Sequence, residues 1–181
     1  MNTDLLTYPD PPLSDESIRL RPWTIDDLPA IEQASHDPYI SDVTSVPPTY
    51  TDDAGRAFIE RQWKKSNGIS LCIADTYTDV ALGFIGIGFE NEAQGRASLG
   101  YWIVPQARGR SISAAAVQLL SEWAFSTHTI PRLELLVEPH NTASQRVAER
   151  AGFRREGLLR SYEEFKGRRA DLIMYARIID D

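Results

Sequence analysis

The middle of this sequence reads as a strand, a short basic loop, a long helix and a second strand. SLGYWIV at residues 98–104 favours a strand that ends before Pro105, because proline cannot donate to a β-ladder. RLELLVEP at residues 132–139 alternates largely between apolar and acidic side chains and predicts another strand. A strand–helix–strand crossover makes its two strands parallel neighbours. The helix between them is predicted from an apolar stripe at helical spacing: Ile112, Ala116, Leu119, Leu120 and Trp123.

The segments on either side predict antiparallel pairing around this crossover. Alternating or apolar runs predict strands at 17–23, 68–76, 81–90, 155–165 and 171–179, and helical patterns cover 24–36, 51–66 and 142–151. A length of 181 residues fits one domain. We therefore expect an α/β (α+β) fold with a mixed, mostly antiparallel sheet, a central parallel strand pair and helices on both faces. The expected division is a flexible N-terminal arm at 1–15 and one domain at 16–181.

The proline-containing segment at 39–53 is expected to be irregular. Loops carry a large share of binding residues, so this segment is a candidate for one lip of an acceptor site. A plain surface connection is the alternative.

The start of the central helix, near residues 111–113, lacks the carboxylate that the helix dipole favours. No Asp or Glu occurs from Ala93 through Ser121, although 26 of the 181 residues are acidic and about four would be expected by composition. Arg108 and Arg110 flank the turn, and Gly109 permits a positive φ. An external anion could take the place of the missing carboxylate. The alternative is an ordinary turn with solvated arginines, capped by Ser111.

Several classes of protein are excluded or disfavoured by motif and composition. The chain has no Gly-Lys-Ser/Thr loop, and the glycines of ALGFIGIGF do not open a helix, so neither the P-loop nor the dinucleotide-binding fingerprint is present. One cysteine and three scattered histidines predict no metal site. A formal charge of −7 argues against a nonspecific nucleic-acid binder and suits a cationic partner. With no signal peptide and no long apolar run, we expect a cytoplasmic protein that does not enter a membrane.

A second motif, NTASQRVAERAGF, begins at Asn141, whose side chain is placed to cap the helix that follows. Together with LGYWI and the PQARGRS loop, the spacing of Asn141, Ser144 and the Gly152-Phe153 pair resembles the GNAT superfamily of N-acetyltransferases. Within it, the chain resembles the branch of ribosomal-protein N-terminal acetyltransferases (RimJ/RimL-like). The resemblance covers nearly the whole chain.

The resemblance implies acetyl-CoA as cosubstrate and no metal. The parallel strands would separate to hold the pantetheine, and a strand amide near Tyr101 would polarise the thioester carbonyl. Asn141 would hold the pantetheine, and Ser144 would protonate the departing thiolate. The family often carries a tyrosine for that role where this chain has Ala148, so Tyr101 or water is the alternative acid. The implied cofactor-binding residues are Trp102, Ile103, Val104, Arg108, Gly109, Arg110, Ser111, Ile112, Ser113, Asn141 and Ser144.

The acceptor is expected to be a primary amine, and a protein N-terminus of the ribosomal-protein type is favoured. Small amines such as polyamines or antibiotics are an alternative, and so is a noncatalytic acyl-CoA-binding module on the same fold. The branch often carries a glutamate at the position of Ser98, so the general base is open, with Glu138 and Glu134 as candidates. A monomer or a homodimer is expected.

Overall fold

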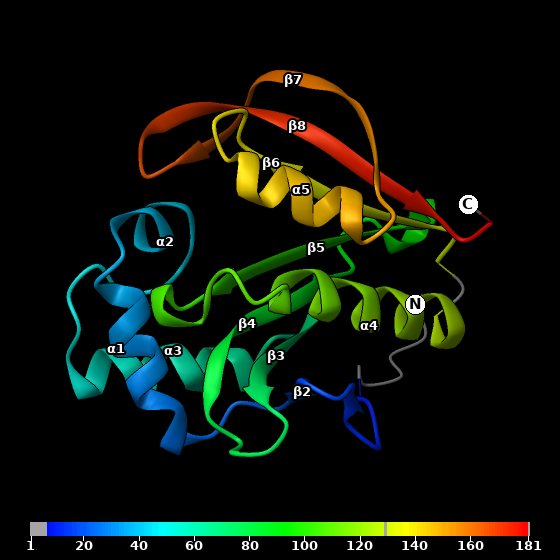
Figure 1. Ribbon diagram of the computed structural model, residues 1–181. Helices are drawn as coiled ribbons and strands as arrows, with labels where there is room; N and C mark the ends of the chain where they lie inside the picture. The colour runs from blue at the N-terminus through cyan, green and yellow to red at the C-terminus, as the bar shows by residue number, and fades with distance from the viewer. Residues whose placement is uncertain (1–6, 129, 181) are drawn as a thin grey trace.

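One eight-stranded sheet runs through the computed structural model, which describes residues 7–128 and 130–180. Every neighbouring pair of strands is antiparallel except β5 and β6, which are parallel. The expected mixed sheet with one central parallel pair is therefore confirmed (Figure 1). In spatial order the strands are β1 (Leu13–Ser14), β2 (Ile18–Arg21), β3 (Gly68–Asp75), β4 (Ala81–Gly88), β5 (Arg96–Ile103), β6 (Arg132–Val137), β8 (Arg168–Ile178) and β7 (Arg154–Phe165).

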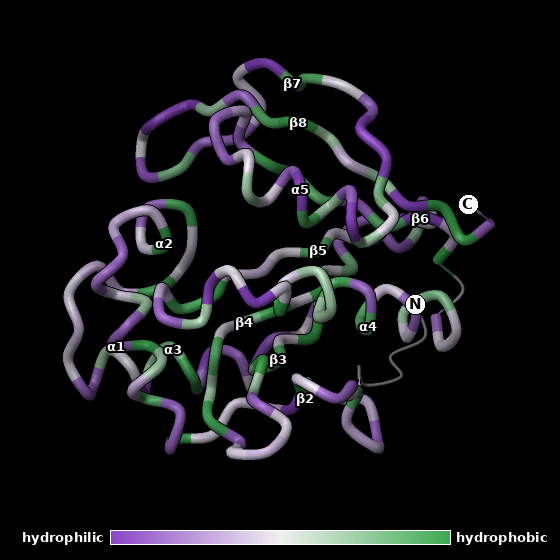
Figure 2. Tube along the Cα trace, viewed as in Figure 1, coloured by the Kyte–Doolittle hydropathy of each residue, from purple (hydrophilic) through white to green (hydrophobic). Residues whose placement is uncertain are grey.

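Helices cover both faces of this sheet, as expected. β3 is buried along nearly its whole length, which requires cover on both sides. Figure 2 shows hydrophobic residues gathered along β3 and β4, whereas the edge strand β7 carries many hydrophilic ones and is largely exposed. The helices are α1 (Leu28–Ser35), α2 (Pro38–Val43), α3 (Asp52–Trp63), α4 (Ile112–Thr127) and α5 (Thr142–Arg150), with short 3-10 turns at Ile25–Asp27, Glu92–Gln94 and Pro105–Ala107.

The parallel pair separates after four residues of each strand. Pairing runs from Arg96 opposite Arg132 to Leu99 opposite Leu135 and then stops. The rest of β5 stays paired with β4 as far as Ile103, and the rest of β6 stays paired with β8 as far as Val137. A gap therefore opens between the two halves of the sheet, with β1–β5 on one side and β6–β8 on the other (Figure 1).

Two segments differ from the sequence-based expectation. Residues 38–43 form helix α2, although this region was expected to be irregular. Asp37 caps the helix by accepting from the amides of Tyr39 and Ile40, and Pro38 occupies the first turn, where its missing N–H costs nothing. In addition, Leu13 and Ser14 pair with β2, so the sheet begins inside the expected arm. The first six residues of that arm lie outside the described residues.

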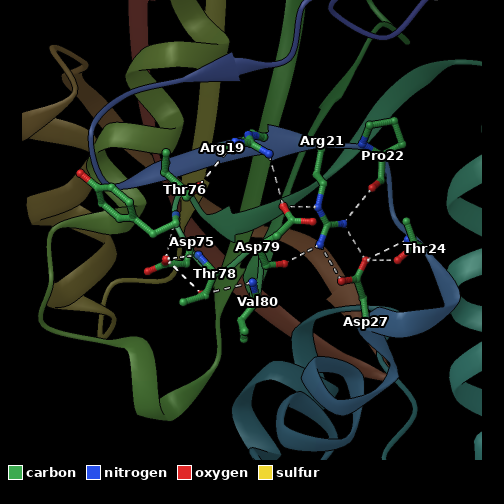
Figure 3. A network of polar contacts seen from close by, with 11 residues as sticks. Arg19, Arg21, Pro22, Thr24, Asp27, Asp75, Thr76, Thr78, Asp79 and Val80 are labelled. Atoms are coloured by element: carbon green, nitrogen blue, oxygen red, sulfur yellow. Dashed lines mark hydrogen bonds and ion pairs between the residues drawn. The ribbon is translucent and has the colours of Figure 1, made fainter.

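A network of polar contacts joins β2 to the first helical turn and to the β3–β4 connection (Figure 3). The guanidinium of Arg21 donates to both carboxylate oxygens of Asp27, at 2.8 and 2.9 Å, and to Asp79 Oδ1 at 3.0 Å. Asp27 Oδ2 also accepts from the Thr24 amide at 2.8 Å, which completes a capping box. These contacts fix the start of the helical segment that leads to α1 and α2.

Candidate active site

A cavity of about 610 Å³ lies where α2, the end of β5, the start of α4 and helix α5 converge. Most of the residues predicted from the sequence line it together: Tyr101, Trp102, Ile103, Arg108, Gly109, Ser111, Ser113, Asn141 and Ser144. Val104 and Ile112 are instead buried in the core beside it. The side chains of Arg110 and Glu138 do not line the cavity.

The loop before α4 leaves the helix N-terminus without a cap from its own residues. Gly109 has φ +79° and Ser111 has φ +60°, so two left-handed residues shape the turn. Ser111 occupies the N-cap position but its side chain makes no cap hydrogen bond, and the first turn contains no acidic residue. The alternative in which Ser111 caps the helix is therefore wrong. The positive end of the helix dipole meets the cavity near Ser113, an arrangement that fits a phosphate group.

The two arginines of this loop are held by carboxylates from other elements. Arg108 Nη2 donates to Asp37 Oδ2 at 2.6 Å, and its Nε donates to the Ile103 carbonyl at 3.3 Å. Burial raises the pKa of Asp37, but hydrogen bonds from Arg108 and from α2 amides outweigh it, so the net pKa is lowered. Arg110 lies 3.6 Å from Asp75 at the end of β3. Its guanidinium is therefore directed away from the cavity, which corrects the expectation that both side chains flank an anion.

Asn141, Ser144 and Tyr101 meet at the gap between β5 and β6. Asn141 Oδ1 accepts from the Ser144 amide at 3.0 Å, which confirms the predicted N-cap, and its Nδ2 donates to the Tyr39 hydroxyl at 3.1 Å. Burial raises the pKa of Tyr101 to about 12, and the neighbouring Ser144 hydroxyl offsets only part of that shift. The Tyr101 hydroxyl has no hydrogen-bond partner among the described residues. Tyr101 therefore remains protonated at neutral pH beside Ser144.

The two glutamates proposed as bases occupy different environments. Glu134 accepts from Arg132 Nε at 2.7 Å and from Arg96 Nη1 at 3.3 Å, so it is a structural ion-pair residue. Glu138 is 5% exposed and accepts from Arg168 Nη2 at 2.9 Å. Its other oxygen, Oε2, has no hydrogen-bond partner within the described chain and lies 4.0 Å from His140 Nε2.

Sequence reasoning named the segment 39–53 as a candidate lip of the site, and its Tyr39 does line the cavity, but other lining residues were missed, among them His140, Arg146 and Arg150. Tyr39 belongs to α2, which the sequence did not predict, and the edge of its ring packs against His140 with centroids 5.6 Å apart. Lys166, at the turn between β7 and β8, donates to the Ser41 carbonyl of α2. The hairpin tip therefore touches α2 across the gap in the sheet. Arg146 and Arg150 lie three and seven positions after Ala143, which also lines the cavity, so helical spacing from Ala143 was the available signal.

Neither a metal centre nor a membrane span is found in the described part of the chain. Residues 7–128 and 130–180 contain no group of three or more His, Cys, Asp or Glu side chains placed to hold a metal ion. In the same ranges, no helix combines the length and the apolar character needed to cross a bilayer.

A splayed parallel strand pair beside an uncapped helix N-terminus defines an α/β protein whose site suits an anionic ligand. The chain belongs to the GNAT family, because residues 17–154 match the family model described as "Acetyltransferase (GNAT) domain". It is therefore an N-acetyltransferase, as the sequence indicated.

Similar proteins agree with this assignment. The chain is 29% identical to the uncharacterized N-acetyltransferase p20 of Bacillus licheniformis over 166 residues, which cover 89% of this chain and 92% of that protein. It is 30% identical to the ribosomal-protein-serine acetyltransferase of Escherichia coli over 102 residues, covering 56% and 57% of the two chains. The structure of RimL, a ribosomal L7/L12 alpha-N-protein acetyltransferase in complex with coenzyme A, superposes with a TM-score of 0.78 at 23% identity, covering 93% of this chain and 97% of that one. This likeness shows a shared fold.

Proposed function

We propose that this N-acetyltransferase uses acetyl-CoA and acetylates the α-amine at the N-terminus of a protein, of the ribosomal-protein type. The observation that carries the proposal is one continuous cavity that begins at the uncapped start of α4 and reaches Asn141 and Ser144 at the strand gap. The names of two relatives, both ribosomal-protein acetyltransferases, support the choice of acceptor. A small amine is the second candidate, since a net charge of −7 favours any cationic acceptor.

The residues of the cavity suit this reaction. Acetyl-CoA supplies the activated acyl group as a thioester. Backbone amides from Arg108 to Ser113 would bind its diphosphate, and Trp102 and Ile103 would lie along the pantetheine. A β5 amide near Tyr101 is no longer used in pairing with β6 and would polarise the acyl carbonyl. Ser144 would donate its hydroxyl proton to the departing sulfur.

The acceptor amine must be neutral before it can attack the acyl carbon. An α-amine has a pKa of about 7.7 to 8.0 and a lysine side chain about 10.4, so an N-terminus needs less help from a base. Glu138 remains our candidate for that base. Glu138 is buried beside His140 and does not itself line the cavity, whereas His140 does. A proton that leaves the amine would therefore reach Glu138 through His140.

The acceptor is tested by measuring CoA release with matched peptides. One set carries a free N-terminus and no lysine, a second set has a blocked N-terminus and one lysine, and a third set consists of polyamines. We expect turnover with free N-termini, and mass spectrometry should place the acetyl group on the α-nitrogen. Turnover confined to polyamines would replace the protein acceptor with a small one. Binding of acetyl-CoA without turnover on any acceptor would contradict the proposed reaction.

We expect Ser144→Ala to lower the single-turnover rate about tenfold while changing acetyl-CoA affinity little. A sole general acid is typically worth more, but Tyr101 is adjacent and stays protonated, so it can replace Ser144 in part. The backbone amide that Asn141 accepts from is retained, so α5 keeps its cap. Rapid-quench kinetics and calorimetric titration measure the two quantities. The Tyr101→Phe variant and the double variant show whether the two hydroxyls share the role, and an unchanged rate in Ser144→Ala would remove Ser144 from it.

A further inference from the structure

Two arginines on α5 line the cavity and have no carboxylate partner among the described residues. Arg146 and Arg150 are four residues apart, so they lie on the same face of the helix, and both line the cavity. Within the described residues, neither guanidinium makes an ion pair or a hydrogen bond. The loop arginines differ in this respect, since Arg108 is paired with Asp37 and Arg110 with Asp75. The unneutralised positive charge of the cavity therefore lies on α5.

The backbone of α5, which carries these exposed arginines, is held close to α4. Gln118 Nε2, on the second turn of α4, donates to the Arg150 carbonyl at 3.2 Å and holds the end of α5 against α4. Val147, half-buried on α5, and Ala114, in the first turn of α4, line the same cavity as the arginines. The cavity thus offers two separate sites for anions, one made of backbone amides and one made of guanidinium groups.

The proposed cosubstrate carries two separate anionic groups. One is the diphosphate, for which the α4 amides suffice, and the other is the phosphate on the 3′ position of its ribose. A terminal phosphate presents several acceptor oxygens, and planar guanidinium groups bind such an anion through paired hydrogen bonds. The chain as a whole carries a charge of −7, but its two unpaired arginines supply the positive charge and the N–H donors that this phosphate requires.

We propose that Arg146 and Arg150 bind the 3′-phosphate and make the enzyme select coenzyme A over its 3′-dephospho form. This inference rests on the proposed use of acetyl-CoA. In this proposal, side chains of α5 select between the two coenzymes. The α4 loop binds the diphosphate, and other residues act on the acyl group.

The test is a calorimetric comparison of CoA and 3′-dephospho-CoA binding to the full-length protein and to the double variant Arg146→Gln/Arg150→Gln. The natural protein should bind CoA at least tenfold more tightly than 3′-dephospho-CoA. The double variant should bind both with the affinity that the natural protein shows for 3′-dephospho-CoA. The matched control is Arg56→Gln/Arg160→Gln, which removes the same charge from exposed positions on α3 and β7 outside the cavity lining and should keep the preference.

Each outcome of this binding comparison supports or contradicts the assignment of the 3′-phosphate to Arg146 and Arg150. Equal affinity of the natural protein for the two ligands would overturn this inference and leave the proposed acetyl-CoA reaction intact. A preference that survives in the double variant would also overturn it, because another group would then hold the phosphate. If neither ligand binds the natural protein, the proposed use of acetyl-CoA fails along with it. Loss of the preference in the Arg56/Arg160 control would show a general charge effect and contradict the assignment to α5.

Discussion

Ser113→Asp is expected to weaken acetyl-CoA binding about a hundredfold while leaving the protein as stable as before, or slightly more stable. Ser113 lies in the first turn of α4, which has no acidic residue and no side-chain cap, and it lines the cavity. A carboxylate there would interact with the free amides and with the helix dipole, which is worth about 0.3–1 kcal/mol of stability. The same carboxylate would repel the diphosphate, and a cost of about 2.8 kcal/mol corresponds to the hundredfold loss.

The opposite signs of the two effects make this variant informative. Isothermal titration gives the affinity and thermal unfolding gives the stability. Ser113→Asn is the control, because it has nearly the same size without the charge and should bind acetyl-CoA nearly normally. Arg108→Glu is less suitable, because Arg108 is paired with Asp37 and the change would place two carboxylates together. Normal acetyl-CoA binding by Ser113→Asp would mean that the diphosphate does not contact this turn.

Asp27→Ala is expected to lower the free energy of unfolding by about 3–5 kcal/mol. Asp27 is 4% exposed and accepts two hydrogen bonds from Arg21, whose side chain is also largely buried. Removing the carboxylate leaves the guanidinium without its buried partner and removes the cap on the Thr24 amide. Denaturant unfolding measures the loss.

Asp79→Asn provides a control in the same network, because Asp79 has φ +58° and asparagine tolerates this conformation better than alanine does. Asp79 also accepts from Arg21, at 3.0 Å, but its side chain is 53% exposed, so water can replace it and we expect a loss of less than about 1 kcal/mol. Equal losses of unfolding free energy in the two variants would show that burial does not determine how much the Arg21–Asp27 pair contributes to stability.

Local patterns predicted most of the fold. The apolar stripe of α4 and the alternation in β6 depend on neighbouring residues, and their bounds agree closely with the structure. Gly109 adopts the positive φ that its position in a turn suggested. Helix α2 was missed because the predicted helix stops at residue 36 and residues 39–53 were expected to be irregular, whereas Pro38 begins a second helix.

The pairings within the site depended on residues far apart in the sequence. Arg108 and Asp37 are 71 positions apart, and Glu138 and Arg168 are 30 apart, so no local pattern links them. The sequence identified Arg108, Asn141 and Ser144 through motif spacing, and the cavity brings them together. It could not separate Glu134, which is held by two arginines, from Glu138, which pairs with Arg168, because both carboxylates occupy similar positions in an alternating segment.

The left-handed Ser111 has a consequence for the protein as a whole. A non-glycine residue in this conformation costs about 1–2 kcal/mol, and here no side-chain hydrogen bond at the helix start offsets that cost. Any anion that completes the turn binds the folded chain and not the unfolded one, so it shifts the folding equilibrium towards the native state. Resistance to heat and to proteolysis would then rise and fall with the concentration of that anion around the protein.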